Sequence, residues 1–147
     1  YYRGVDSFSQ GFELDFSGQI TSRLQASASY TQLSIEDQDG NDARTFVPRK
    51  MFRLTTTYRV PMVDRLKVGA SVNWRDSTYR IPEPGVTIRQ PSYTLLNLMA
   101  SYDFTDKVSA ALTVNNVTDK KYLTSLYWDQ SFYGAPRNVL LSLNMKY

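Results

Sequence analysis

Few side chains in this chain could carry out catalysis, although two acidic stretches have suggestive spacings. Glu13 and Asp15 are two residues apart, so an extended strand would place both carboxylates on one face, as glycoside hydrolysis could use. Residues 36–42, Glu-Asp-Gln-Asp-Gly-Asn-Asp, are similar to the start of a calcium loop but lack its remaining ligand spacing and closing Glu. The sequence has no His and no Cys, which removes Ser-His-Asp and Cys-His catalysis, imidazole metal sites and Cys-based zinc sites. Solvated acidic groups are the favoured interpretation, and no catalytic residue, cofactor or metal site is predicted.

Composition points to strands and away from nucleic acid. The chain has 11 Tyr against 7 Gly and is rich in Ser, Thr and Asn, which favours β-structure. The net charge of +3 is modest and the basic residues are scattered, so no nucleic-acid groove is indicated. No run of about 18 apolar residues exists that could form a transmembrane helix. The mean hydropathy of −0.42 suggests a soluble protein. Mean hydropathy does not identify transmembrane strands, however, because alternate residues of such strands face a polar lumen.

Apolar and polar residues alternate with the period of a β-strand in successive segments. The last segment is typical: Leu141 and Leu143 fall on one face, and Ser142 and Asn144 fall on the other. The segments comprise residues 11–16, 24–31, 52–60, 66–75, 96–104, 108–115 and 137–147. This pattern predicts an all-β fold, an antiparallel transmembrane β-barrel of which the chain supplies about seven strands.

The connections between these segments alternate in length. Short turns are expected at residues 18–22, 61–64 and 105–107, and long loops at residues 36–48, 79–91 and 118–136. Outer-membrane barrels have short periplasmic turns and long extracellular loops. If Tyr147 lies at the periplasmic end, all the short turns fall on the periplasmic side.

A soluble lipocalin-like barrel or sandwich would also alternate, with charged residues on its solvated face. Here the polar face carries mainly Ser, Thr, Asn and Gly. Aromatic residues fall near both ends of the apolar face, such as Phe52 and Trp74 at one end and Tyr58 and Tyr102 at the other, as in interfacial girdles. The apolar stretch from Leu66 to Trp74 would cover about 20 Å of membrane after tilt. The membrane interpretation is therefore favoured.

The chain is expected to be the C-terminal part of a longer barrel. It has no initiator Met and no signal peptide, although an outer-membrane protein must be exported. Bacterial single-chain barrels have even strand numbers, and lipid does not tolerate open sheet edges. An odd number of strands therefore predicts that further strands exist.

Four stretches resemble the barrels of TonB-dependent outer-membrane receptors, in order along the chain. Residues 115–122, Asn-Asn-Val-Thr-Asp-Lys-Lys-Tyr, resemble a stretch before the last strand of that family, with Thr118 where Phe is usual. Residues 133–143 resemble the Gly-x-Pro-Arg entry to the final strand, and residues 10–18 resemble a recurring Gly-x-Glu strand. Pro48-Arg49 also precedes its strand as in the family. The likeness is greatest to receptors for hydroxamate or pyoverdine-type ferric siderophores.

This resemblance implies a barrel of about 22 strands whose lumen is filled by an N-terminal plug. The implied location is the outer membrane of a Gram-negative bacterium, with outer-membrane lipid around the barrel. The implied function is to bind a ferric siderophore at the cell surface and import it with energy from TonB, which acts through the plug. Iron would enter only as part of the ligand. The plug and the TonB box are not within these 147 residues.

Aromatic residues are dense between Tyr122 and Tyr133, with five in twelve positions. A siderophore pocket needs flat aromatic faces, and cations if the ferric complex is anionic. The best candidate contacts are Tyr127, Trp128 and Tyr133, followed by Arg75, Tyr79 and Arg80 at the top of another strand. The alternative is that these aromatic residues pack loop against loop or join the upper girdle.

Other charged residues have simpler expectations. Arg137 is expected to pair with a neighbouring acid, and the alternative is that it faces the ligand pocket. The charged residues of the polar face are expected to pair with one another or to contact the plug: Glu13, Asp15, Arg53, Arg59, Lys67 and Asp103.

Three other functions stay open. The same architecture could carry cobalamin, haem or a glycan, with the missing His counting against haem. A small outer-membrane adhesin, porin-like barrel or enzyme would leave the family motifs unexplained, and an enzyme would need a base that His usually supplies. A soluble β-sandwich binding module is the third.

Overall fold

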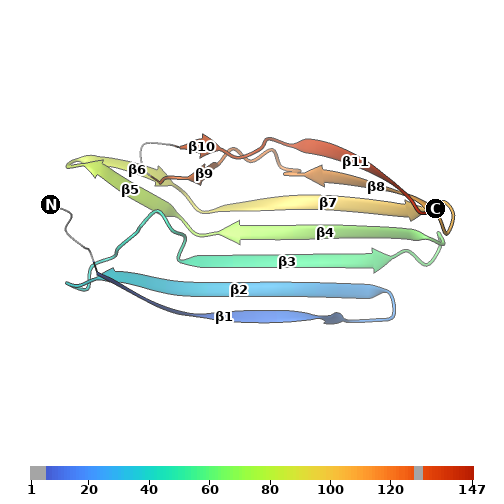
Figure 1. The fold of residues 1–147 in the computed structure, drawn as a ribbon, viewed down its shortest axis with the longest axis horizontal. Coiled ribbons are helices and arrows are strands. Elements are labelled where there is room, and N and C mark those ends of the chain that lie inside the picture. Colours follow the sequence, from blue (N-terminus) through green and yellow to red (C-terminus); the bar gives the residue numbers. More distant parts are fainter. Residues whose placement is uncertain (1–5, 128–130) are drawn as a thin grey trace.

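The computed structural model describes residues 6–127 and 131–147, and every regular element in them is a β-strand. One antiparallel sheet has the order β1-β2-β3-β4-β7-β8-β11 (Figure 1). Its strands are β1 Ser7–Gln19, β2 Leu24–Asp37, β3 Lys50–Arg59, β4 Leu66–Arg75, β7 Tyr93–Asp103, β8 Val108–Asn115 and β11 Asn138–Met145. Two short strand pairs lie at the end of this sheet that is opposite the C-terminus: β5 Thr78–Glu83 with β6 Val86–Gln90, and β9 Leu123–Ser125 with β10 Phe132–Tyr133. Within the described ranges, no helix is long and apolar enough to cross a bilayer.

The register places most of the apolar residues of these strands on one face of the sheet. Residues that pair directly across antiparallel strands point to the same side. One apolar row runs through Phe16, Ala28, Leu54, Val72 and Leu96. The neighbouring row on the opposite face runs through Ser17, Ser27, Thr55, Ser71 and Asn97. The alternation predicted from the sequence is confirmed across the whole sheet.

The apolar face is exposed rather than packed into a core. Leu141 is 64% exposed and Leu143 is 67% exposed, and Leu98 is also exposed. Among the described residues, the buried hydrophobic side chains are only Ile35, Tyr93 and Leu126. A soluble sandwich buries one sheet against a second layer. This sheet has no such layer in the described part of the chain, and a broad exposed apolar face is typical of a membrane-facing surface.

Aromatic side chains mark both margins of the apolar face. Tyr30, Phe52 and Trp74 are in register on three adjacent strands, and the Phe12 ring lies 5.9 Å from that of Tyr30. Tyr102 and Phe104 form an edge-to-face pair with centroids 5.1 Å apart near the other margin. These positions agree with the predicted pair of interfacial girdles.

All the short turns lie at one end of the sheet, the same end as the C-terminus, as predicted (Figure 1). Two of these turns use a threonine to satisfy backbone donors. The Thr21 hydroxyl accepts the backbone N–H of Arg23 and Leu24, and the Thr105 hydroxyl accepts those of Lys107 and Val108. Such side-chain turns close hairpins tightly. We call this the short-turn end, and the other the long-loop end.

Two strands and two loops differ from the sequence prediction, and one of these loops, residues 118–136, contains the short β9–β10 pair. β1 and β2 pair beyond the segments expected from the alternation, as far as Ser7 with Asp37. The backbone ladder continues there although the pattern changes, because Leu33 and Ile35 fall on the face that is polar elsewhere in the sheet. The expected loop at residues 79–91 contains the β5–β6 hairpin, whose turn uses Gly85 at a φ of 86°. That conformation favours glycine because a Cβ is strained there.

Candidate ligand site at the long-loop end

Asn116 joins several segments of the chain where β8 ends. Its side-chain Oδ1 accepts the Lys120 N–H at 2.8 Å, and its Nδ2 donates to the carbonyls of Lys120 and Ala135 at 2.9 and 3.1 Å. Its backbone N–H donates to Asn97 Oδ1 at 2.9 Å. Asn116 is 4% exposed and has a φ of 49°, a backbone region that Asn tolerates better than most residues. The second Asn of the Asn-Asn motif therefore closes the loop.

Gly134 leaves space for the ring of Tyr122, because it has no side chain. A Cβ at Gly134 would overlap that ring, and the Gly134 N–H donates to the Tyr122 carbonyl at 2.8 Å. The Tyr122 ring stacks on Tyr93 with centroids 4.6 Å apart and an interplanar angle of 29°. Tyr93 is 6% exposed. The Tyr and Gly of two separate motifs thus meet in space, which explains both residue types.

Arg137 is held by an acid in a different way from the one expected. Asp119 Oδ1 accepts the backbone N–H of Arg137 at 2.8 Å, and the guanidinium of Arg137 donates to the Val117 carbonyl at 3.5 Å. The neighbouring Asn115 bonds the side chain of Asn138 at 2.9 Å rather than loop backbone. Both contacts fix the entry to β11.

The acidic stretch at residues 36–42 forms a hydrogen-bonded turn. Asp37 Oδ1 accepts the backbone N–H groups of Asp39 and Asn41, each at 2.9 Å. The hydrogen bond from the Asn41 backbone is the main cause that lowers the pKa of the Asp37 carboxyl. This turn lies at the long-loop end, beyond the aromatic girdle. Gly40 completes the turn with a φ of 79°. One oxygen of the Asp37 carboxylate is therefore engaged in hydrogen bonds within the turn.

One hollow of about 360 Å³ lies on the polar face, and the stacked tyrosines form part of its wall. Arg75, Tyr93 and Tyr122 line it, together with Arg53 and Glu13 from neighbouring strands. Arg75 lies directly opposite Tyr93 in the register. The hollow therefore combines a cation with two aromatic rings.

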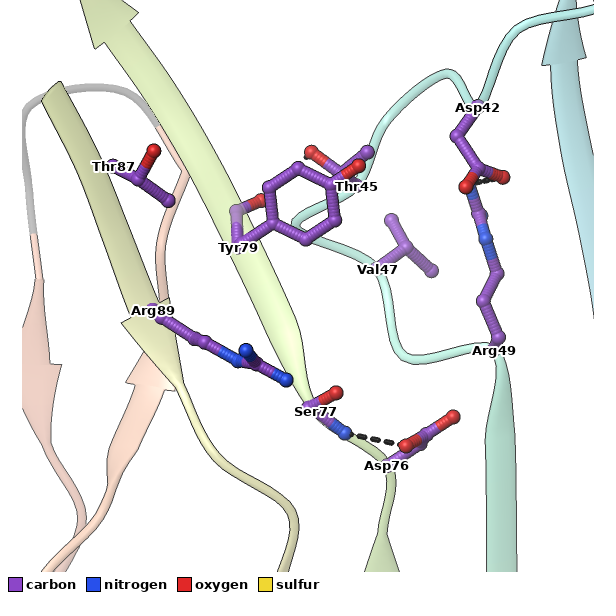
Figure 2. A pocket seen from close by; sticks show the side chains of 9 residues that line it. All are labelled: Asp42, Thr45, Val47, Arg49, Asp76, Ser77, Tyr79, Thr87 and Arg89. Atoms are coloured by element: carbon purple, nitrogen blue, oxygen red, sulfur yellow. Dashed lines mark hydrogen bonds and ion pairs between the residues drawn. The ribbon is translucent and has the colours of Figure 1, made fainter. Parts of the chain in front are cut away.

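A second hollow of about 420 Å³ lies between the 42–49 segment and the β5–β6 hairpin (Figure 2). Tyr79 and Arg89, which pair across the hairpin, contribute one side, and Arg49 contributes another. Figure 2 shows the Tyr79 ring beside Thr45 and the Arg89 side chain extending from β6 towards Ser77. The Thr45 hydroxyl donates to the Tyr79 carbonyl at 2.7 Å, which ties the loop to β5.

Arg49 anchors the loop that forms this second hollow. Its Nη2 donates to the carbonyls of Ile35, at 3.1 Å, and Ala43, and lies 3.8 Å from Asp42 Oδ1. Its Nη1 is buried and has no hydrogen-bond partner among the described residues. The Arg of the Pro-Arg motif therefore has a structural role and one unused donor group beside the hollow.

The predicted contact residues are spread over several places. Arg75 lines the first hollow and Tyr79 lines the second. Arg80 follows Tyr79 in β5, so its side chain leaves the strand on the opposite side. Tyr127 contacts Phe46 with centroids 5.2 Å apart, and the Tyr133 ring lies 4.6 Å below Lys121 Nζ.

Neither Tyr127 nor Tyr133 lines either hollow. Trp128 lies outside the described residues. The described candidates therefore do not converge on a single cavity, and the choice among them stays a prediction.

Sequence reasoning did not select Tyr93, Tyr122, Arg49 or Arg89 as lining residues. Two features of the sequence bear on the positions of these residues. Pro84-Gly85 separates two short alternating stretches, which is typical of a hairpin turn and would have placed Arg89 opposite Tyr79. Tyr122 and Gly134 were visible as motif residues, but their contact depends on the fold.

Comparison with known proteins agrees with this geometry. A family model described as "TonB dependent receptor-like, beta-barrel" matches residues 1–117. The ferripyoverdine receptor of Pseudomonas aeruginosa is 34% identical over 96% of this chain and 18% of its own length. The ferric-pyoverdine BN7/BN8 receptor of Pseudomonas putida is 35% identical over 100% of this chain and 18% of its own length. The chain thus spans about a fifth of the length of these curated relatives.

Solved structures show the same fold. The P. aeruginosa receptor FpvA bound to heterologous pyoverdines superposes with a TM-score of 0.90 at 32% identity, over 98% of this chain and 20% of that one. The siderophore receptor PiuA of Acinetobacter baumannii superposes with a TM-score of 0.80 at 30% identity, over 97% of this chain and 22% of that one. Both similarities extend over the sheet and its loops.

Proposed function

The chain belongs to the TonB-dependent receptor β-barrel family, and from that premise we propose that it forms part of a receptor that imports a ferric siderophore. Receptors of this family lie in the outer membrane of Gram-negative bacteria, and the exposed apolar face of the sheet is suited to that location. The observation that carries the proposal is that the two faces of the sheet and its long-loop end differ in chemical character. Lipid-facing residues lie on one face, a polar wall on the other, and aromatic and cationic hollows at the long-loop end.

The substrate class we propose is a pyoverdine-type ferric siderophore. The two relatives described above are named as receptors for ferric pyoverdines. A ferric siderophore of this kind presents a flat chromophore and anionic groups, which suit aromatic faces and guanidinium groups. Arg75 with Tyr93 and Tyr122, and Arg89 with Tyr79, supply that combination.

The remaining parts of the proposal concern energy and chemistry. Import would draw on TonB through a plug domain elsewhere in the receptor. Iron enters only as cargo, held by the siderophore. The relatives are named as receptors, which supports a transport role without catalysis.

The test is uptake of radiolabelled cargo, with iron labelled in the siderophores and haem and cobalt labelled in cobalamin, by cells whose only siderophore receptor is the full-length protein. Ferripyoverdines of several peptide types, ferrioxamine, haem and cobalamin would be supplied in parallel. Saturable uptake with at least one ferripyoverdine, abolished when TonB is deleted, is expected. Uptake or growth supported only by haem or cobalamin would replace the proposed substrate, and no TonB dependence would reject the mechanism.

A further inference from the structure

One row of the sheet register crosses the polar face at the height of the stacked tyrosines. Its members pair directly across five adjacent strands, so their side chains point to the same side of the sheet. The row consists of Glu13, Thr31, Met51, Arg75 and Tyr93. All five residues line the first hollow, of about 360 Å³. The first hollow therefore extends across the strands rather than along one of them.

The two ends of this row carry opposite charges. Glu13 in β1 lies three strand spacings from Arg75 in β4, which is about 14 Å. The uncharged Thr31 and Met51 lie between them, and the Thr31 hydroxyl donates to Glu13 Oε1 at 3.3 Å. The first hollow thus has a carboxylate at one end, and a guanidinium next to the Tyr93 ring at the other.

A second cation in the first hollow adds to this separation of charge. Arg53 also lines the hollow, and its Nε donates to Asn73 Oδ1 at 2.9 Å, which ties its guanidinium to β4. On the opposite side, Asp15 follows Glu13 on the same face of β1 and lines a neighbouring hollow. Positive charge therefore gathers towards β4 and negative charge towards β1.

These opposite charges do not neutralise one another. No ion pair within the described part of the chain involves Glu13, Arg53 or Arg75. An acid and a cation on neighbouring strands of this face do pair, since Lys67 Nζ lies 3.5 Å from Asp103 Oδ2. The separation of about 14 Å between Glu13 and Arg75 exceeds the Debye length, about 8 Å at physiological ionic strength. Each end of the first hollow can therefore attract a ligand group of its own.

We propose that the first hollow selects a siderophore that carries a cationic group, an ammonium or a guanidinium, roughly 14 Å from an anionic group. Arg75 binds the anionic group, and Glu13 is the specificity-determining residue that binds the cationic one. The inference rests on the proposed function, because it takes the first hollow to be part of the ligand site, and it adds the charge pattern of the cargo. The hollow of about 360 Å³ lies within the usual range of ligand pockets. A purely anionic ligand would meet the Glu13 carboxylate and be disfavoured.

The experiment changes one side chain of the receptor and one group of the ligand. The purified full-length receptor is titrated with a ferripyoverdine whose peptide carries a free amine, and with the same ferripyoverdine after acetylation of that amine. Acetylation should raise the Kd of the wild type about fivefold, because one ion pair with an exposed carboxylate is lost. Glu13→Gln should bind the free-amine ligand about fivefold more weakly than the wild type does, and should bind both ligands with equal affinity.

Two further variants serve as controls. Asp15→Asn removes a carboxylate from the same face of β1 but outside the first hollow, so it matches Glu13→Gln in net charge. This variant should still distinguish the two ligands about fivefold. Arg75→Ala should weaken the binding of both ligands by the same factor, because the anionic group is present in each. Heat-modifiable migration on gels confirms that every barrel is assembled.

The possible outcomes separate this inference from the proposed function. Equal affinity of the wild type for the free and acetylated ligands would overturn the inference without any variant. Discrimination that persists in Glu13→Gln would overturn it too. An equal loss for both ligands in that variant would assign Glu13 to a contact within the receptor, with the same consequence. A wild type that binds no ferripyoverdine would reject the proposed function and this inference with it.

Discussion

The ring of Tyr122 stacks on Tyr93 at a centroid distance of 4.6 Å, so the loop before β11 is fastened to the first residue of β7. Gln90 reinforces this link, because its Oε1 accepts the Leu123 N–H at 2.7 Å and its Nε2 donates to the Pro91 carbonyl at 2.7 Å. Gly134 leaves room for the Tyr122 ring. The loops that border the proposed ligand site are therefore held by side-chain contacts in addition to the sheet.

Replacing Gly134 with Val should disturb this arrangement. The added side chain would occupy the space of the Tyr122 ring, and overpacking of this kind costs about 1–3 kcal/mol. Ferripyoverdine binding by the full-length receptor, measured by fluorescence titration, should weaken while the barrel still assembles. Gly18→Ala is the matched control, because a Cβ at Gly18 meets nothing within 4 Å. Unchanged binding by Gly134→Val would contradict a role for the stack in shaping the site.

Asn116→Ala should loosen the loop from Val117 to Pro136. The variant loses three side-chain hydrogen bonds, each worth about 0.5–1.5 kcal/mol, and places Ala at a positive φ. Limited proteolysis of intact cells should cut this loop several-fold faster than in the wild type. Asn115→Ala serves as the control, since Asn115 makes one exposed contact with Asn138. Similar cleavage of both variants would show that Asn116 does not close the loop.

Arg75→Ala should lower the affinity for an anionic ferric siderophore. A hydrogen bond to a charged group is worth about 1.5–3 kcal/mol, which corresponds to roughly a 10- to 100-fold increase in Kd. Lys50→Ala removes a cation at a similar height on the lipid-facing side, where it pairs with Gln32, and should leave Kd within about twofold of the wild type. Titration of both purified receptors with ferripyoverdine makes the comparison. Equal losses for the two would remove Arg75 from the site.

Leu141 and Leu140 offer a direct test of the orientation of the sheet. Leu141 lies opposite Leu112 on the apolar face, whereas Leu140 lies opposite Thr113 on the polar face. A lysine at position 141 should cost about 2–4 kcal/mol in lipid near the bilayer midplane, and one at position 140 should be tolerated in the lumen. Urea unfolding of the full receptor in vesicles would measure both. A greater loss for Leu140→Lys would reverse the assignment of the faces.

The sequence by itself determined the seven strands of the sheet, their lipid-facing and lumen-facing residues, and the gathering of the short turns at one end. These features could be predicted because alternation in a strand is local, with a period of two residues. The structure extends β1 and β2 beyond that pattern, since backbone pairing does not require apolar side chains. The β5–β6 hairpin had a turn signal in Pro84-Gly85, but the stretches beside it are short.

Only the tertiary structure decided which loop residues meet. Tyr122 reaches Gly134 and Tyr93, Arg89 lies across a hollow from Arg49, and Arg59 lies opposite Lys67. Each of these contacts depends on strand register and loop path, and a shift of one residue would move every side chain to the other face. Alternation indicates the face on which a residue lies, whereas its neighbours across the strands are set by the pairing of the whole sheet.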